Sequence, residues 1–204
     1  MNGKIWYLLI PGAIYLIARS KKMSEMPEEW AAWADSSDIL VPAGGDADVR
    51  LQVLSHRKVI LKYAWSYKID PALISGIIHV ESEGISDALR AGSNDIYTGL
   101  MQLGFKTAKA FGYTGSVEGL LSPDSNVSFG TKYFKSQYDR YGKNLYDAIS
   151  AYNAGHSLCS GIVCGNQRYV NDVLNAAMTY RLTYGFIWKY QWYFPSYLYE
   201  YIGL

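Results

Sequence analysis

The sequence predicts a mostly α-helical fold from three observations. Apolar residues recur at intervals of three and four over residues 70–82, as they do along the buried face of a helix. No segment shows a convincing strand alternation, and no internal repeat is visible. Half of the 204 residues are hydrophobic, which is enough to build a packed core. We therefore expect one helical domain with a segment of different character at each end.

Residues 1–22 are expected to form a hydrophobic N-terminal segment outside the domain. Residues 5–18 are apolar apart from a Pro-Gly interruption, and Arg19, Lys21 and Lys22 follow. This run is shorter than the ~20 residues of a membrane-spanning helix, so a signal segment, a membrane anchor and a packed arm all stay open. Because the basic residues follow the run, the positive-inside rule would keep an anchored domain in the cytoplasm.

Residues 23–50 are expected to form a linker or an irregular arm. Prolines, a Gly-Gly pair and scattered acids interrupt any periodic pattern there. Trp30 and Trp33 are the exceptions, since their large side chains can dock on a neighbouring surface.

The domain itself is expected over residues 51–180. Its first helix begins near residue 48 or 55 and ends at residue 67. A loop is expected over residues 84–98. The remaining expected helices cover residues 70–82, 107–111, 126–141, 145–154 and 167–180.

Glu81 stands out because it lies on the apolar face of the helix over residues 70–82. Asp70 can cap this helix and Pro71 suits its first turn, so the register is well defined. Steps of three and four residues back from Glu81 reach apolar side chains of the core-facing stripe, Ile78, Ile77 and Ile74. Partial burial would raise the pKa of this carboxyl group and suit it to donate a proton near neutral pH. Taken alone, a buried structural acid or a solvent-facing helix end explains it equally well.

Residues 181–204 are expected to form an aromatic-rich C-terminal tail. The chain contains 19 tyrosines and 6 tryptophans, and many of them fall in this short segment. Such a density suits a membrane interface or a protein contact, and an extra element packed over the domain is the alternative. The net charge of +1 provides no polyanion-binding surface, so nucleic acid is not an expected partner.

Cys159 and Cys164 are the only cysteines and are separated by four residues. A disulfide-closed loop is expected if the protein matures in an oxidising compartment, and two free thiols if it does not. Without a second pair or a histidine cluster, the sequence offers no metal site. His56 and His79 are expected to be ordinary helix residues, and no cofactor is expected.

Three separate motifs stand in order along the chain: Glu81-Ser82, Gly99-Leu100-Met101-Gln102, and Ala151-Tyr152-Asn153-Ala154-Gly155 followed by Tyr169-Val170. In their order and spacing they resemble the soluble lytic transglycosylases, which cleave peptidoglycan. Further similar stretches are Asp70–Ile74, Leu120–Pro123, Asn126-Val127 and Gly130. The resemblance covers about residues 57–180 and implies a lysozyme-like fold.

The resemblance implies that Glu81 is the catalytic residue. In this family a single glutamate acts as acid and then as base, while the substrate's N-acetyl group assists and its own C6 hydroxyl attacks. The product is a 1,6-anhydro sugar end, formed without water, from the bond between N-acetylmuramic acid and N-acetylglucosamine. Ordinary glycoside hydrolysis would need a second acid, and no motif of this sequence contains one. A mechanism with a single glutamate needs only Glu81.

The same resemblance implies a set of substrate-binding residues. Ser82 directly follows Glu81, as in the Glu-Ser pair of the family, and is expected to bind substrate. The alternative is a helix-end hydroxyl that bonds the backbone. Tyr169 would point its hydroxyl at the glutamate, with a core tyrosine as its alternative, and Leu100 is expected in the core. The full substrate-binding set is Ser82, Gly99, Met101, Gln102, Tyr152, Asn153 and Tyr169.

The sequence departs from the family pattern on both sides of Gly99-Leu100-Met101-Gln102. Residues 96–98 are Ile-Tyr-Thr where the family usually has Gly-Ala, and residues 103–105 are Leu-Gly-Phe where a proline is usual. These changes bear on the shape of the groove and its subsite preference, and they leave the position of the acid unaffected.

Two alternatives stay open beside the transglycosylase. One is a muramidase similar to goose-type lysozyme, which needs a second acid to position water. The other is a virion or envelope structural protein that binds glycan without cleaving it. The expected partner is the peptidoglycan glycan strand, with membrane, virion or envelope contacts through residues 1–22 and 181–204. The expected location is the membrane-associated, periplasmic side of the cell envelope, or a bacteriophage particle, which would deliver the domain to the wall without secretion.

Overall fold

The structure, a computed structural model, describes residues 26–36 and 46–183. Its helices are α2 Glu28–Asp35, α3 Ala47–Ser55, α4 Arg57–Tyr67, α5 Pro71–Ser82, α6 Phe105–Ala110, α7 Pro123–Arg140, α8 Leu145–Ala154 and α9 Gln167–Thr183, with a short 3₁₀ helix η1 at Glu118–Leu121. The prediction of a mostly helical domain is confirmed.

The beginning of α5 follows the sequence prediction. The Asp70 side chain accepts a hydrogen bond from the Ala72 backbone N–H at 2.8 Å, and Pro71 occupies the first turn. The helix ends at Ser82, because Glu83 adopts the left-handed conformation with φ of 55° and Gly84 follows with φ of 82°. Both ends of the helix that carries Glu81 are therefore fixed by local chemistry.

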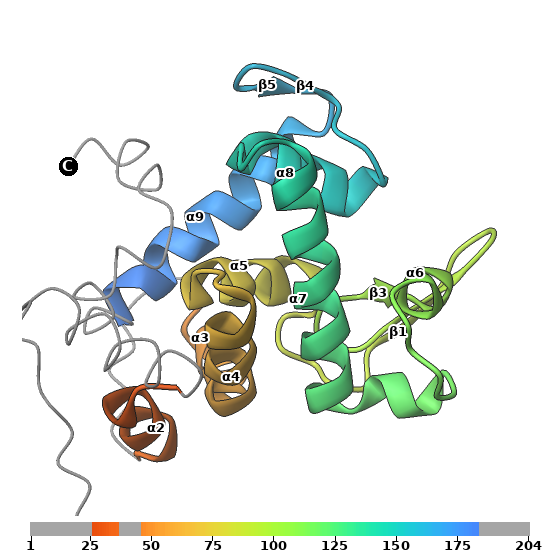
Figure 1. The fold of residues 1–204 in the computed structure, drawn as a ribbon. Helices are drawn as coiled ribbons and strands as arrows, with labels where there is room; N and C mark the ends of the chain where they lie inside the picture. The colour runs from red at the N-terminus through yellow and green to blue at the C-terminus, as the bar shows by residue number, and fades with distance from the viewer. Residues whose placement is uncertain (1–25, 37–45, 184–204) are drawn as a thin grey trace, which may run out of the picture.

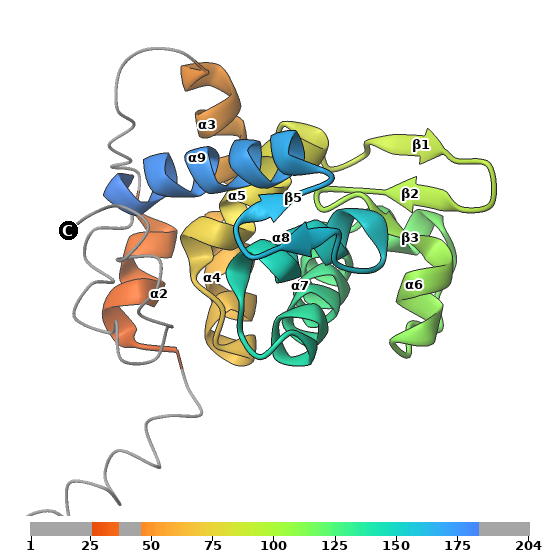
Figure 2. The same ribbon diagram turned by 90° about the horizontal axis from the view of Figure 1, so that it is seen from above.

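Helices α5 and α9 approach each other very closely. A Cβ atom added at Gly76 would lie 2.7 Å from the Val173 carbonyl oxygen and 2.9 Å from the Ala177 backbone nitrogen. Glycine costs α5 about 0.5–1 kcal/mol relative to alanine, and the close packing of the two backbones offsets this cost. In both ribbon views α9 runs beside α5 (Figures 1 and 2).

A buried ion pair joins the start of α5 to the end of α9. The Arg181 guanidinium donates hydrogen bonds to Asp70 Oδ2 from Nη2 at 2.7 Å and from Nε at 3.1 Å. Both side chains are less than a tenth exposed. Since Asp70 also caps α5, one carboxylate fixes both the helix start and the position of α9.

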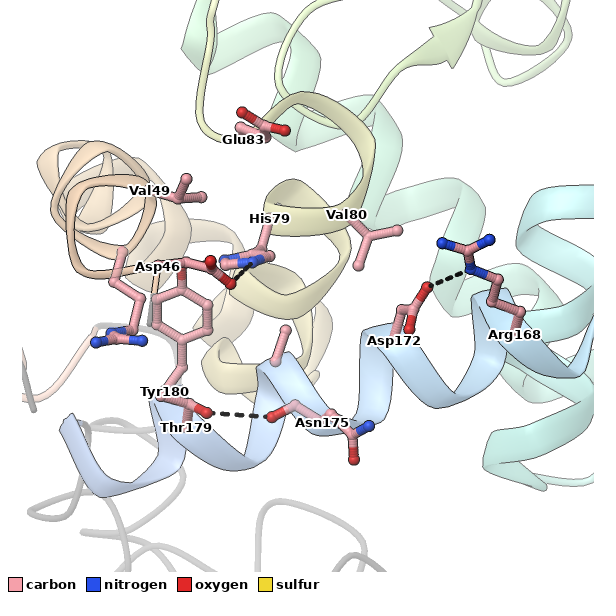
Figure 3. Close-up of a pocket in the computed structure, with 12 residues that line it drawn as sticks. Asp46, Val49, His79, Val80, Glu83, Arg168, Asp172, Asn175, Thr179 and Tyr180 are labelled. Carbon is pink, nitrogen blue, oxygen red and sulfur yellow. Dashed lines mark hydrogen bonds and ion pairs between the residues drawn. The ribbon is translucent and has the colours of Figure 1, made fainter. Parts of the chain in front are cut away.

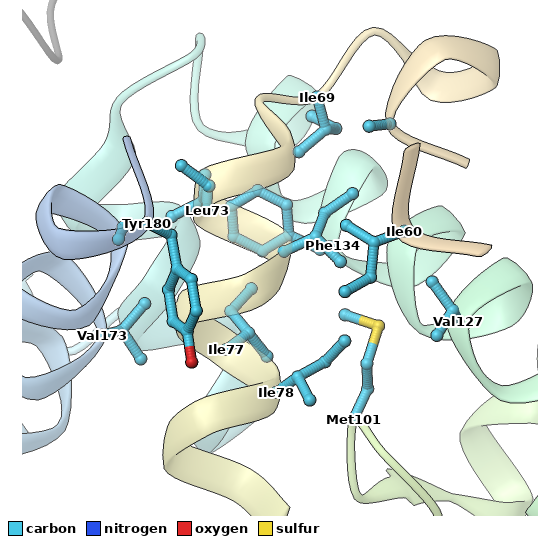
Figure 4. Packing of buried hydrophobic residues seen from close by; sticks show 14 of the residues in the cluster. Ile60, Ile69, Leu73, Ile77, Ile78, Met101, Val127, Phe134, Val173 and Tyr180 are labelled. Carbon is cyan, nitrogen blue, oxygen red and sulfur yellow. The ribbon is translucent and has the colours of Figure 1, made fainter. Parts of the chain in front are cut away.

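The core surrounds α5, most of whose residues are buried. Figure 4 shows the isoleucines of α5 facing Phe134 of α7 on one side and Val173 and Tyr180 of α9 on the other. The prediction that Ile74, Ile77 and Ile78 face the core is confirmed, because all three are fully buried.

Short strands occur where a loop was expected. Strands β1 Leu89–Ala91, β2 Ile96–Thr98 and β3 Leu103–Gly104 form an antiparallel sheet in the order β1-β2-β3. Strands β4 Cys159–Ser160 and β5 Val163–Cys164 form a second antiparallel pair. Strands of two or three residues are too short to show an alternation in sequence. In both views the β1–β3 sheet and α6 lie at one end of the domain (Figures 1 and 2).

Residues 28–35 correct the expectation of a linker over residues 23–50. They form α2, and the Trp30 side chain is fully buried. Its ring meets that of Trp65 in α4 edge-to-face, with the centroids 5.5 Å apart. The burial of this aromatic side chain stabilises a helix that its eight-residue length alone would leave marginal.

Other boundaries differ by small shifts. The first expected helix is two helices, α3 and α4, which meet at His56. Helix α9 continues to Thr183, three residues beyond its expected end. The hydrophobic segment over residues 1–22 and the tail beyond residue 183 lie outside the described residues. Within the described part, no helix is long and apolar enough to span a bilayer.

Replacing Gly76 with alanine is expected to destabilise the domain by about 1–3 kcal/mol, because the new methyl group must push α5 and α9 apart. Urea unfolding followed by circular dichroism measures this change. Gly165→Ala is the matched control, since a Cβ there meets its nearest atom at 3.4 Å, and its effect should stay within about 0.5 kcal/mol. A Gly76→Ala variant as stable as the parent would contradict the packing argument.

Candidate active site

Glu81 lies near the C-terminal end of α5 and is partly buried. The hydroxyl of Tyr169, in the first turn of α9, donates a hydrogen bond to Glu81 Oε1 at 2.6 Å. These two residues are 88 positions apart in sequence, and the close packing of α5 against α9 brings them together.

Burial raises the pKa of Glu81 above its ordinary value of 4.5, while the Tyr169 hydroxyl and the positive charge of Arg90 act in the opposite direction. Burial is the largest of these effects, so the net direction is upward. Burial and the nearby Glu81 charge raise the pKa of the Tyr169 hydroxyl well above 10.0, which keeps it a proton-bearing donor. Burial thus shifts this acid toward its protonated form, and the Tyr169 hydroxyl orients it.

A cavity of about 200 Å³ opens in front of Glu81. Beside Glu81 of α5, its walls come from the β1–β3 sheet, α6, α7 and the end of α8. Of the described residues that line it, Glu81 is the only acid. The lining is Glu81, Arg90, Tyr97, Gln102, Leu103, Gly104, Thr107, Tyr133, Tyr152, Asn153, Ala154 and Gly155.

Two of the predicted substrate-binding residues, Tyr152 and Gln102, line the cavity and are held in one orientation by hydrogen bonds. Tyr152 donates its hydroxyl proton to the Met101 carbonyl oxygen at 2.8 Å, and burial raises its pKa well above 10.0. Gln102 donates from Nε2 to the carbonyl oxygens of Ala88 at 3.2 Å and Gly99 at 3.1 Å. Because these bonds occupy the NH₂ group, the carbonyl oxygen Oε1 is the group that Gln102 offers to the cavity.

Four predicted substrate-binding residues do not line this cavity. One is Tyr169, which is joined to it only through its hydrogen bond to Glu81. The buried Ser82 hydroxyl donates to the carbonyl oxygens of Ile78 at 3.2 Å and Leu100 at 2.7 Å, so it ties the following loop to α5. Met101 is fully buried, and its sulfur faces the core (Figure 4). A Cβ at Gly99 would lie 2.5 Å from the Asn126 side chain, so this glycine serves backbone packing. Ser82, Met101 and Gly99 therefore lie behind the wall of this cavity, and their contact with substrate stays a prediction.

The Asn126 side chain fixes the backbone over residues 98–101. Its fully buried side chain accepts from the Met101 N–H at 2.8 Å and donates to the carbonyl oxygens of Thr98 at 2.7 Å and Leu120 at 3.1 Å. One buried amide thus joins backbone groups of β2, of the loop that follows it and of η1.

Sequence reasoning missed several residues of the wall. Arg90 and Tyr97 pair directly across β1 and β2, and the guanidinium carbon lies 4.8 Å from the ring centroid. Tyr133 comes from α7 and packs against Tyr152, with ring centroids 5.2 Å apart. Residues of this kind carry no local motif. The available signals were the tyrosine content of the chain and, for Tyr97, the departure from the family pattern at residues 96–98.

Asn153 lines the cavity and accepts a hydrogen bond at Oδ1 from Asn166 Nδ2 at 3.0 Å. Asn166 comes directly after the β4–β5 hairpin, which a disulfide between Cys159 and Cys164 closes. These cysteines pair directly across the two strands. The disulfide thus braces the segment from which Asn166 reaches back to the wall.

A larger cavity of about 600 Å³ lies between α3, α5 and α9 (Figure 3). It is lined by His79 and Val80 of α5 and by Glu83 just after the helix. His79 projects from a face of α5 roughly opposite to Glu81. Its rim contains two ion pairs, His79 with Asp46 at 3.6 Å and Arg168 with Asp172 at 3.7 Å. The carboxylates of Asp46 and Asp172 are more than half exposed, so this cavity lacks a sheltered acid like Glu81.

No group of three or more histidine, cysteine, aspartate or glutamate side chains suited to hold a metal ion occurs in residues 26–36 and 46–183.

Residues 58–160 match the sequence model of the transglycosylase SLT domain. A transglycosylase of Enterobacteria phage PRD1 is 35% identical over 89 residues, which are 44% of this chain and 31% of the phage protein. The chain thus matches about a third of the length of this relative. These findings confirm the resemblance seen in the sequence.

Solved structures agree with the fold. An inactive glutamate-to-glutamine mutant of the lytic transglycosylase Slt from Pseudomonas aeruginosa aligns with a TM-score of 0.57 and 28% identity, covering 65% of this chain and 25% of that one. The 70 kDa soluble lytic transglycosylase of Escherichia coli aligns with a TM-score of 0.54 and 19% identity, over 86% and 35% of the two chains. Its complex with bulgecin A aligns similarly, with a TM-score of 0.55.

Replacing Glu81 with glutamine is expected to stabilise the fold, and more so as the pH rises. Because the folded-state pKa lies above 4.5, the native protein loses stability as the pH rises from 4.5 through that pKa. Glutamine removes this loss, so the stability difference should be absent below pH 4.5 and constant above the folded-state pKa. Each pKa unit by which the folded-state value exceeds the unfolded-state value adds about 1.4 kcal/mol to this stability difference. Urea unfolding from pH 3.5 to 8 measures the difference, and a pH-independent difference would contradict the burial argument.

Replacing Tyr169 with phenylalanine is expected to raise the pKa of Glu81 further, because the hydrogen bond that favours the carboxylate is lost. Carboxyl ¹³C chemical shifts measured during a pH titration report this pKa directly. Tyr141→Phe removes a hydroxyl that bonds the Ser157 backbone, and it should leave the Glu81 titration unchanged. A Glu81 pKa that stays constant or falls in Tyr169→Phe would show that the hydroxyl does not favour the charged form.

Proposed function

Because the chain belongs to the transglycosylase SLT domain family, whose sequence model covers just over half of it, we propose that it is a peptidoglycan lytic transglycosylase. It cleaves the β-1,4 bond between N-acetylmuramic acid and N-acetylglucosamine and leaves 1,6-anhydro ends. The observation that supports this most strongly is the single, sheltered, pKa-raised carboxyl group of Glu81 beside the cavity.

In this proposal Glu81 first acts as the acid. Its raised pKa leaves a proton available for the oxygen of the departing sugar. Since Tyr169 donates to Oε1, the transferable proton is carried by the other oxygen, Oε2. Tyr169 therefore orients the acid and selects which oxygen reacts.

Glu81 then acts as the base. Loss of its proton leaves a carboxylate, which the Tyr169 hydroxyl and the positive charge of Arg90 stabilise. The N-acetyl group of the substrate assists at the sugar carbon, and the carboxylate takes the proton of the C6 hydroxyl as that oxygen closes the 1,6-anhydro ring. One acid serves both steps, and water takes no part.

A hydrolase on the same scaffold is less well supported. Hydrolysis normally needs a second carboxylate, ~5 Å away for retention or ~6.5–9.5 Å away for inversion. Both oxygens of Asp95 accept from the backbone N–H of Lys106, and Glu83 lines the other cavity. The described wall thus offers no second acid for positioning water.

A structural protein that only binds glycan is also less well supported, because binding alone needs no sheltered acid with an oriented donor. The similar Pseudomonas aeruginosa enzyme is inactive as a glutamate-to-glutamine mutant, which fits a reaction carried by one glutamate. Similarity to a bacteriophage transglycosylase and to bacterial enzymes supports a site of action at the cell envelope, reached from the periplasm or in a virion. We extend the proposal to membrane or virion contacts through residues 1–22 and the aromatic tail.

The chain is expected to release peptidoglycan fragments with anhydro ends, each one water lighter than the hydrolytic product, as mass spectrometry of a digest would show. Glu81→Gln should lower the rate at least about 100-fold, the usual contribution of a positioned proton donor. Glu83→Gln is the control, because it makes the same change at an exposed acid outside the wall, and it should keep near-parental activity. Hydrated ends, or full activity in Glu81→Gln, would overturn the proposal.

A further inference from the structure

The Asn166 side chain lies in a hydrogen-bond network between α8 and the disulfide-closed hairpin. Its Oδ1 accepts from the Ser150 hydroxyl at 2.6 Å. Its Nδ2 donates to the Ser150 carbonyl oxygen at 3.1 Å and to Asn153 Oδ1 at 3.0 Å. The Ser150 hydroxyl in turn accepts from the Leu158 N–H at 3.1 Å.

Two backbone groups fix the direction of every bond in this network. The Leu158 N–H can only donate, so the Ser150 hydroxyl oxygen accepts from it and directs its own proton to Asn166. The Ser150 carbonyl oxygen can only accept, so the NH₂ group of Asn166 must face it. Neither backbone group can reverse its role, and the Asn166 amide therefore has one allowed orientation.

The orientation of Asn166 determines that of Asn153. Because Asn166 offers N–H to Asn153, the facing atom of Asn153 must be its carbonyl oxygen Oδ1. The Asn153 NH₂ group then points away from Asn166, and within the described residues it donates to no protein acceptor. Asn153 lines the cavity of Glu81, so this NH₂ group is what it offers to a ligand.

We propose that Asn166 is a positioning residue, which fixes the Asn153 amide so that the cavity presents a hydrogen-bond donor at this point of its wall. The matching ligand group is an acceptor, either the carbonyl oxygen of an acetamido substituent or a sugar hydroxyl oxygen. The inference builds on the proposed function, which supplies the glycan. Gln102 offers the complementary carbonyl acceptor elsewhere on the same wall.

The hairpin holds Asn166 where it can act. The Cys164 N–H donates to Gln167 Oε1 at 2.7 Å, and the Gly165 N–H donates to the Leu158 carbonyl oxygen at 3.0 Å. With the disulfide between Cys159 and Cys164, these bonds fix the backbone on both sides of the amide. Without this support the Asn153 side chain would sample both amide orientations. In one of them its carbonyl oxygen would face an acceptor group of the ligand, and no hydrogen bond could form.

Asn166→Asp tests the proposal with an almost isosteric change. The aspartate cannot donate to Asn153 Oδ1, so the Asn153 amide turns its NH₂ group toward the new carboxylate and its carbonyl oxygen toward the cavity. KM for peptidoglycan fragments is expected to rise about 5- to 10-fold, the equivalent of about one hydrogen bond, with kcat within twofold. Binding of an N-acetylglucosamine tetramer, measured by calorimetry in Glu81→Gln, should weaken by the same factor.

Asn171→Asp is the matched control. It makes the same change in the adjoining helix α9, at an exposed residue that bonds Gln167 and lies outside the wall, and it should leave KM and tetramer binding unchanged. In an Asn153→Ala background, Asn166→Asp should have no further effect, because the residue through which it acts is gone. An unchanged KM in the single variant, or an undiminished effect in the Asn153→Ala background, would overturn the proposal.

The orientation itself can be measured without ligand. In the free chain the Asn166 side-chain NH₂ protons should exchange slowly, and Asn153→Ala should make one of them exchange faster by NMR. If neither proton is protected, the network does not hold Asn166 and the inference fails. A wild-type chain that neither cleaves peptidoglycan nor binds the tetramer would instead refute the proposed function, while the exchange experiment still decides the positioning role.

Discussion

The close contact between α5 and α9 is the constraint on which the rest of the site depends. At Gly76 the two backbones come too near for any side chain. Glu81 near one end of α5 therefore meets Tyr169 at the beginning of α9, and Asp70 at the other end meets Arg181. Neither pair lies close in sequence, and both follow from the same packing of two helices.

The wall of the cavity is held by polar side chains that satisfy backbone groups from behind. Ser82, Asn126 and Tyr152 all bond the loop over residues 98–101, and each is buried. Buried polar groups are costly unless they are paired, so a loop fixed in this way has few alternative conformations. Glu81 thus faces a wall whose backbone is anchored from behind by buried side chains.

Local chemistry made some of these features predictable from sequence. The cap at Asp70, the proline after it and the apolar periodicity defined α5 and placed Glu81 on its buried side. The β1–β3 sheet could not be predicted, because its strands are too short for a pattern. The roles of Met101, Ser82 and Gly99 could not be predicted either, because a motif does not reveal which of its residues face the cavity. Arg90, Tyr97 and Asn166 reach the site through tertiary pairing, which leaves no local signal.

The pair of Asp70 and Arg181 has a consequence for where this chain can be shortened. The sequence pattern predicts that the last helix ends at Tyr180. A protein truncated after this residue to remove the aromatic tail would lack Arg181. The Asp70 carboxylate would remain buried without its cation, at a cost of about 3–5 kcal/mol, at the residue that also starts the helix that carries Glu81. A truncated form meant for crystals or solution assays should therefore keep every residue through Thr183, where α9 ends.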